Sequence, residues 1–177
     1  MRKAIAAAAT AMLAGAALLA GQASTAKATE QRPITPLAWL VGGVWTADAS
    51  KMAPGLKIET RYSWSDNGAY IRFTTHFVNE KGTMKNYDGQ FYWDAEPAGL
   101  RVWYMDARNH ITQGPVEVEG DLMQIAFRAE DFQGKMADLR VQVARKTNDH
   151  YTWTLEEKQP AGWDQLASLE YLRMPEK

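Results

Sequence analysis

The sequence contains no cysteine, and this absence excludes several kinds of chemistry at once. The 177-residue chain can form no disulfide, carries no lipid-modified cysteine and offers no thiol nucleophile. It also lacks a G-x-S-x-G nucleophile elbow, an H-E-x-x-H helix and a phosphate-binding loop. Covalent catalysis therefore has no obvious nucleophile, and the sequence predicts no metal site.

Long hydrophobic runs are also absent, except at the N-terminus. Residues 1–28 fit a cleaved export signal, because Arg2 and Lys3 precede a small apolar stretch that ends in an A-x-A cleavage site. We expect cleavage after Ala28, with a cut after Ala23 as the alternative. The alanine-rich stretch is too weakly hydrophobic to favour a transmembrane anchor. The sequence therefore predicts a periplasmic or secreted protein with no stable membrane anchor.

Positive charge is not in excess. Removal of residues 1–28 leaves 17 basic and 21 acidic residues, a net charge of about −4. A nucleic-acid partner would need clustered positive charge to displace counterions from phosphates. The composition therefore argues against nucleic-acid binding.

The chain that remains suits a single domain. We expect residues 29–36 to form an extended lead-in and residues 37–177 to form the domain. The first four residues of the domain can make one helical turn. Hydrophobicity then alternates with a period of two, and turn residues such as Asp66-Asn67-Gly68 recur about every ten residues. The predicted strands are Val44–Ala49, Leu56–Ser65, Ala69–Val78, Thr83–Asp94, Leu100–Asp106, His110–Glu119, Leu122–Glu130, Met136–Lys146, Tyr151–Lys158 and Gln165–Arg173.

Ten strands with short connections and no helix between them predict an antiparallel meander. Such a meander leaves two edge strands exposed unless it closes on itself. We therefore expect an all-β protein, an antiparallel up-and-down barrel of about ten strands. A two-sheet sandwich is the alternative, but it usually needs longer crossover connections.

The segment at the start of the first strand carries a family resemblance. Gly43-Val44-Trp45 resembles the G-x-W signature of the calycin group, which includes the lipocalins and fatty-acid-binding proteins. The wider opening from Leu37 looks most like the nitrobindin-like and related secreted members. The resemblance implies that an Arg or Lys of the last strand packs across the Trp, and Arg173 stands at that place. Gly43, Trp45 and Arg173 are thus the expected structural signature of a calycin-like barrel.

Nitrobindins hold haem through a His just before the final strand. This chain has Pro160-Ala-Gly-Trp-Asp-Gln165 there and no His, so the sequence favours a protein without cofactor. A haem function would need His76 or His150 as a substitute iron ligand.

The remaining catalytic candidates are His76 and the pair Asp106 and His110. His76 shares a strand face with the polar residues Arg72 and Thr74, and the inward face of a barrel strand is normally the apolar one. This favours a solvent-facing His76. Asp106 and His110 flank a tight connection, where they could orient and activate a base, although Asp is also an ordinary turn residue.

Aromatic residues dominate the predicted strands, and a ten-stranded barrel is wider than its side chains readily fill. We therefore expect a cavity that binds a small apolar or aromatic molecule. The expected ligand-binding residues are Tyr62, Trp64, Phe73, Thr75, Tyr87, Phe91, Trp93, Trp103, Met105 and Trp153. Parity could place Phe91, Trp93, Trp103 and Met105 on one face, but a slip of one residue would invert every such assignment.

Three other functions remain open at this point. One is a cofactor-independent enzyme, of the isomerase or cyclase kind, that uses His76 or the Asp106/His110 pair. Another is haem binding of the nitrobindin type. The last is a structural or interaction role.

Overall fold

The structure, a computed structural model, describes residues 33–130 and 134–176. The export signal at residues 1–28 and the lead-in up to residue 32 lie outside the described residues. A short 3-10 helix, η1 (Thr35–Leu40), opens the described chain. It begins inside the lead-in expected to be extended, because Ile34 turns into the core and is 1% exposed.

Ten strands follow η1. They are β1 (Val44–Asp48), β2 (Lys57–Trp64), β3 (Ile71–Asn79), β4 (Gly82–Ala95), β5 (Ala98–Asp106), β6 (Ile111–Glu119), β7 (Leu122–Glu130), β8 (Met136–Thr147), β9 (His150–Gln159) and β10 (Gly162–Met174).

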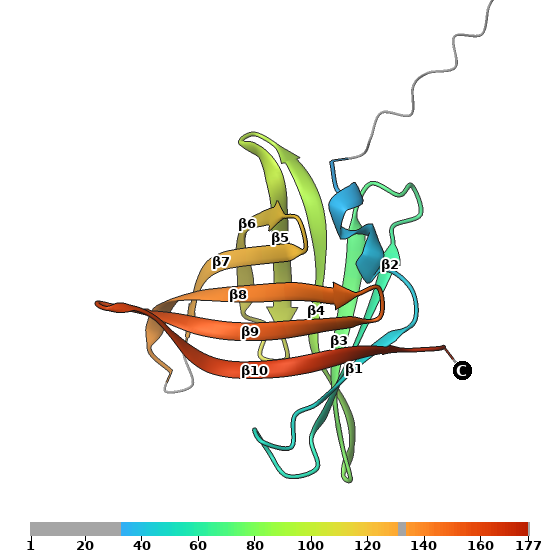
Figure 1. The fold of residues 1–177 in the computed structure, drawn as a ribbon, viewed down its shortest axis with the longest axis vertical. Coiled ribbons are helices and arrows are strands. Elements are labelled where there is room, and N and C mark those ends of the chain that lie inside the picture. The colour runs from blue at the N-terminus through green and yellow to red at the C-terminus, as the bar shows by residue number, and fades with distance from the viewer. Residues whose placement is uncertain (1–32, 131–133, 177) are drawn as a thin grey trace, which may run out of the picture. The chain divides into compact units, whose positions relative to one another are not determined.

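The strands form one closed antiparallel barrel. Each strand pairs with its neighbours in sequence, and β1 pairs with β10 to close the ring. Figure 1 shows β10, in red, crossing beside β1 and β9. The predicted fold class and the ten strands are confirmed, and the sandwich alternative is wrong because a single closed sheet has no second layer. No helix in residues 33–130 and 134–176 is long and apolar enough to cross a membrane.

The inward face of the barrel is set by the alternation of apolar residues along each strand. On β8, for example, Leu139, Val141 and Val143 are buried while the residues between them are not. Burying such side chains stabilises the fold by roughly 2 kcal/mol each. Cross-strand pairing then brings these residues beside the inward residues of β7 and β9.

Bulges interrupt this alternation at three places. Between β3 and β4 the register shifts after Thr75, so that Tyr87 pairs with Thr75 while Met84 pairs with Phe77. Thr75 and Phe77 are two residues apart and both line the interior. Their partners Tyr87 and Met84 are three residues apart, a spacing that a regular alternation would place on opposite faces. Further shifts occur at Gln165/Ala167 in β10 and at Arg145/Thr147 in β8.

One end of the barrel is closed around Trp45, which is completely buried. Its indole nitrogen donates a hydrogen bond to the carbonyl oxygen of Leu40 at 2.8 Å, which ties η1 to β1. The Arg173 guanidinium carbon lies 4.5 Å from the centroid of the Trp45 ring, a cation–π distance. Arg173 also donates hydrogen bonds to the carbonyl oxygens of Trp39, Val41 (3.0 Å) and Asn148 (2.8 Å).

Gly43 makes this packing possible. Its φ of +67° lies in the left-handed region that favours glycine. A Cβ atom there would also lie 2.8 Å from both the Arg173 side chain and the Met174 carbonyl oxygen. The Gly-x-Trp pattern and Arg173 thus form one interlocked unit at the closed end.

Candidate functional site

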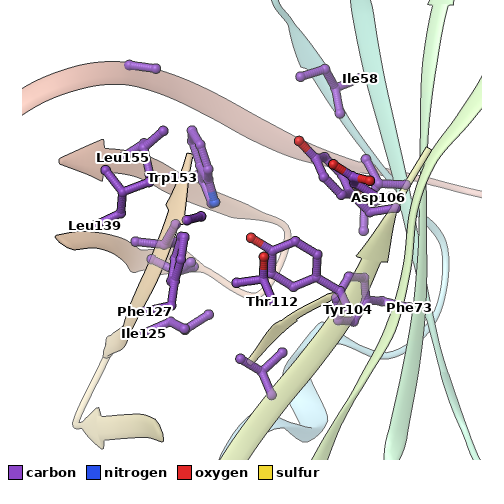
Figure 2. Close-up of a pocket in the computed structure, with 18 of the residues that line it drawn as sticks. Ile58, Phe73, Tyr104, Asp106, Thr112, Ile125, Phe127, Leu139, Trp153 and Leu155 are labelled. Atoms are coloured by element: carbon purple, nitrogen blue, oxygen red, sulfur yellow. Dashed lines mark hydrogen bonds between the residues drawn. The ribbon is translucent and has the colours of Figure 1, made fainter. Parts of the chain in front are cut away.

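The barrel encloses a cavity of about 460 Å³. This volume lies within the range of small-molecule sites. Figure 2 shows side chains from opposite walls converging on one space, with Leu139, Trp153 and Leu155 facing Phe73 and Tyr104. The side chains that line the cavity fall into three zones, which we call the floor, the middle and the mouth.

The floor lies against the closed end and is lined by five hydroxyl groups. We call these residues the hydroxyl cluster: Thr60, Tyr62, Thr75, Tyr151 and Tyr171. Tyr151 joins the cluster to the closed end, because its ring packs 4.7 Å from that of Trp45 and stacks 4.8 Å from that of Tyr171. The polar atoms of the floor therefore lie beside the buried, packed aromatic rings of the closed end.

Contacts between hydroxyl groups connect the cluster internally. The hydroxyl oxygens of Thr60 and Thr75 are hydrogen-bonded at 2.9 Å. The Tyr171 hydroxyl interacts with Thr60, and the Tyr62 hydroxyl interacts with Tyr151. The cluster thus holds several hydroxyls in fixed positions within an otherwise apolar wall.

Burial at the floor strongly disfavours negative charge. It raises the pKa of Tyr62 to about 12, and it raises the pKa of Tyr151 and of Tyr171 well above the usual tyrosine value. The described residues that line the floor supply no cation to offset such a charge. The floor is therefore an uncharged, hydrogen-bonding surface.

The middle zone is mainly apolar. Its walls are formed by side chains of β3 to β9, among them Phe73, Ile125, Phe127, Val141 and Leu155. Their apolar surface favours a ligand that leaves water.

One polar pair breaks this apolar surface, where the Tyr104 hydroxyl interacts with Thr112 and burial raises the tyrosine pKa to about 12. Gly89 makes room for the rings, since a Cβ atom there would lie 2.5 Å from the Cβ of Tyr104 and 2.8 Å from the ring of Phe73.

The mouth lies at the opposite end from Trp45, and it is the only zone with acidic or basic side chains among the described lining residues. These are Asp106, Arg108, His110, Arg128 and Glu130, which stand at the ends of β5 and β7 or in the β5–β6 turn. The rim also carries three exposed apolar side chains from separate loops and strand ends: Met52, Ile111 and Met136.

Asp106 organises the β5–β6 turn at the mouth. Its carboxylate accepts hydrogen bonds from the backbone N–H groups of Arg108 (2.8 Å) and His110 (2.9 Å). Partial burial acts to raise the pKa of Asp106, but these hydrogen bonds outweigh it and lower the pKa below its usual value. The His110 ring nitrogen Nδ1 lies 3.7 Å from the same carboxylate. The geometry therefore shows a turn-forming aspartate with an exposed histidine beside it.

Of the ten residues expected to bind a ligand, six line the cavity. They are Tyr62, Phe73, Thr75, Tyr87, Phe91 and Trp153. Trp64 and Trp93 do not line it. Trp64 packs against the core, and Trp93 is 43% exposed.

Trp103 and Met105 lie on the outer face of β5, so the expected grouping of Trp103 and Met105 with Phe91 is wrong. The two-residue turn between β4 and β5 pairs Phe91 with Val102 and Gln90 with Trp103. Val102 and Tyr104 therefore face inward, whereas Trp103 and Met105 face outward. This is the inversion that a shift of one residue produces.

Of the three histidines, one lines the cavity and two lie outside it. His110 lines the mouth, whereas His76 is absent from the cavity lining and lies on the outer side of β3. His150 hydrogen-bonds to Glu170 at 2.5 Å outside the cavity. Neither His76 nor His150 can therefore ligate an iron inside the cavity. No cluster of three or more metal-ligating side chains occurs in the described part of the chain.

Sequence reasoning missed Thr60, Tyr104, Thr112, Tyr151 and Tyr171 as cavity residues. A signal for two of them was present, because Thr60 lies two residues before Tyr62 and Tyr104 lies two residues after the inward Val102. The turn at Glu96-Pro97 would have fixed the β4–β5 register and hence the parity of Tyr104.

Comparison with known proteins gives no family assignment. No family model matches the sequence, and no curated protein is significantly similar to it. Among solved structures, the chain is similar to the crystal structure of Rv2717c from M. tuberculosis, with 11% sequence identity and a TM-score of 0.48. The match covers 80% of this chain and 97% of that protein.

Proposed function

We propose that the protein binds a small, mainly apolar or aromatic molecule inside the barrel. The observation that carries this proposal is the enclosed cavity of about 460 Å³, with apolar walls, a few fixed polar groups and charge only at its mouth. A site of this kind takes an apolar ligand out of water and orients it through a few hydrogen bonds. The site needs no cofactor for this, and we propose that none is bound.

The partner is therefore a small molecule rather than a nucleic acid, in keeping with the acidic composition. We further propose that the barrel is calycin-like, since the contact between Trp45 and Arg173 at the closed end is the one the family resemblance implies. The N-terminal sequence supports export to the periplasm without a stable membrane anchor. N-terminal sequencing of protein from a periplasmic extract tests this, since the expected first residue is Thr29, and an uncleaved cytoplasmic chain would contradict it.

A fluorescence titration with N-phenylnaphthylamine tests the binding proposal, because this uncharged probe brightens when it leaves water. We expect saturable binding to the wild-type protein. The variant Leu139→Trp fills the cavity from a buried wall position and should weaken binding at least tenfold. The same substitution at Leu122, an exposed residue outside the cavity lining, should leave the affinity unchanged.

Two results would overturn the proposal. One is the absence of saturable binding to folded wild-type protein. The other is equal loss of binding in the Leu139→Trp and Leu122→Trp variants. Native mass spectrometry on protein purified from its own host complements the titration, because a retained ligand would add its mass to that of the chain.

A further inference from the structure

The hydroxyl cluster contains more hydrogen-bond donors than its members use among themselves. Five hydroxyl groups supply five O–H donors. The Thr60–Thr75 hydrogen bond uses one of these donors, and the contacts of Tyr171 with Thr60 and of Tyr62 with Tyr151 use at most two more. At least two donors at the floor are therefore available to a ligand.

An unused buried donor is costly, so a fitting ligand brings an acceptor to the floor. A carbonyl oxygen has two lone pairs and no donor of its own, which matches two free O–H groups. On another wall of the cavity the indole nitrogen of Trp153 is directed into the same space (Figure 2) and adds a further donor. The polar groups of the interior thus favour an acceptor group over a donor group.

The lack of a cation among the described residues of the floor restricts the ligand further. A carboxylate placed there would lose its hydration without gaining a cation, since the arginines that line the cavity, Arg108 and Arg128, stand at the mouth. The high pKa values of the floor tyrosines report the same unfavourable environment for an anion. An uncharged oxygen avoids this cost.

We propose that the hydroxyl cluster binds the carbonyl oxygen of an uncharged, mainly apolar ligand, such as a ketone, quinone or ester, whose apolar body fills the middle zone. This inference rests on the proposed binding function and names the ligand class of that same cavity. The ligand enters with its carbonyl end first and leaves its other end at the mouth. A free carboxylic acid of the same skeleton is a poor ligand because it is ionised at neutral pH.

The test uses prodan, a naphthyl ketone whose emission responds to hydrogen bonding at its carbonyl. We expect it to bind the wild-type full-length protein and to bind about fivefold to tenfold more weakly to Tyr171→Phe and to the double variant Tyr62→Phe/Tyr151→Phe. Each variant keeps the ring and removes only the hydroxyl. Prodan emission should also shift to shorter wavelength in these variants. The matched control Tyr92→Phe changes a tyrosine outside the cavity lining and should leave both readouts unchanged.

N-phenylnaphthylamine separates failure of this inference from failure of the proposed function. It has no carbonyl, so its affinity should change less than about twofold in the hydroxyl variants. If it binds but prodan is insensitive to Tyr171→Phe and to the double variant, the carbonyl inference is overturned and the binding function stands. If neither probe binds folded wild-type protein, both are overturned. Should the double variant fail to fold, Tyr171→Phe alone carries the comparison.

A competition pair tests the restriction on charge. Methyl naphthoate and naphthoate share one skeleton and differ in that the ester is uncharged and the acid is an anion. We expect the ester to displace prodan at least tenfold more effectively than the acid. Equal displacement by the two compounds would overturn the inference.

Discussion

The two ends of the barrel both contain arginine and apolar side chains, but these side chains are packed at the closed end and largely exposed at the mouth. At the closed end, Arg173 is bound to three backbone carbonyls and stacked over the ring of Trp45, which is fully buried together with Leu37 and Leu40 of η1. At the mouth, Arg108 contacts Asp106 and Glu130 only at 3.7 and 3.9 Å, and apolar side chains remain exposed. The contrast indicates that one end supplies stability and the other supplies access.

The largest effect of a single residue is expected from Trp45→Ala at the closed end. Removing a fully buried indole leaves a cavity and an unpaired Leu40 carbonyl, and should lower the free energy of unfolding by about 4 kcal/mol. Denaturant unfolding measures this loss. Trp93→Ala, at an exposed indole, is the control and should cost less than about 1 kcal/mol. Equal losses in the two variants would remove the distinction between the closed end and the rest of the barrel.

Alkaline pH should destabilise the cavity interior. The pKa of Tyr62 and of Tyr104 is raised to about 12, so each keeps its proton more tightly in the folded state than in the unfolded chain. Their contribution, about 3 kcal/mol each, is present below pH 10 and is lost as the pH rises from 10 through 12.

Denaturant unfolding at increasing pH, together with tyrosinate absorbance, measures this effect. A Tyr62→Phe/Tyr104→Phe variant should show a flatter decline above pH 10. Ionisation of all tyrosines near pH 10 in the folded protein would contradict the prediction.

A smaller effect is expected from Arg173→Lys. A lysine keeps the charge but cannot reach three carbonyl oxygens in the planar arrangement of a guanidinium. The free energy of unfolding should fall by about 2 kcal/mol. Arg108→Lys at the mouth is the matched control and should change it by less than about 0.5 kcal/mol, because exposed ion pairs contribute little. The comparison fails if both substitutions have the same cost.

The smallest effect is expected from Ile111→Ser at the rim of the mouth. Its side chain is 67% exposed, so stability should stay within about 0.5 kcal/mol of wild type. The affinity for N-phenylnaphthylamine should fall less than about threefold, because the rim adds little to the buried contact area. A large loss of stability would show that the mouth also contributes to the fold.

The fold was readily predicted from the sequence because its signals are local. Alternating hydrophobicity and turns such as Asp66-Asn67-Gly68 placed all ten strands close to their observed bounds. The closed-end residues were expected because Gly43 and Trp45 match a Gly-x-Trp pattern that resembles the calycin signature, and that resemblance implied Arg173 on the last strand. Each of these features can be identified without knowing how strands pair.

The interior was harder to predict because it depends on register. Trp103 and Tyr104 are neighbours of similar character, and only the pairing of β5 with β4 shows which one faces inward. Bulges add to the difficulty, since the shift after Thr75 changes the parity of β4 halfway along the strand. The residue type of a threonine such as Thr60 does not mark it as a cavity residue, and only its spacing from the inward-facing Tyr62 does so, although threonines contribute much of the polar chemistry of the floor.

The seam between β1 and β10 also affects how the protein folds. Nine of the ten pairings in the barrel join strands that are adjacent in sequence, whereas the seam joins residues such as Thr46 and Leu172, 126 positions apart. Closing so long a loop costs about 4 kcal/mol in chain entropy, which the contacts of the seam must offset. The hairpins can therefore assemble early and quickly, while the seam sets the contact order and the folding rate. Until it forms, both edge strands stay open to pairing with other chains.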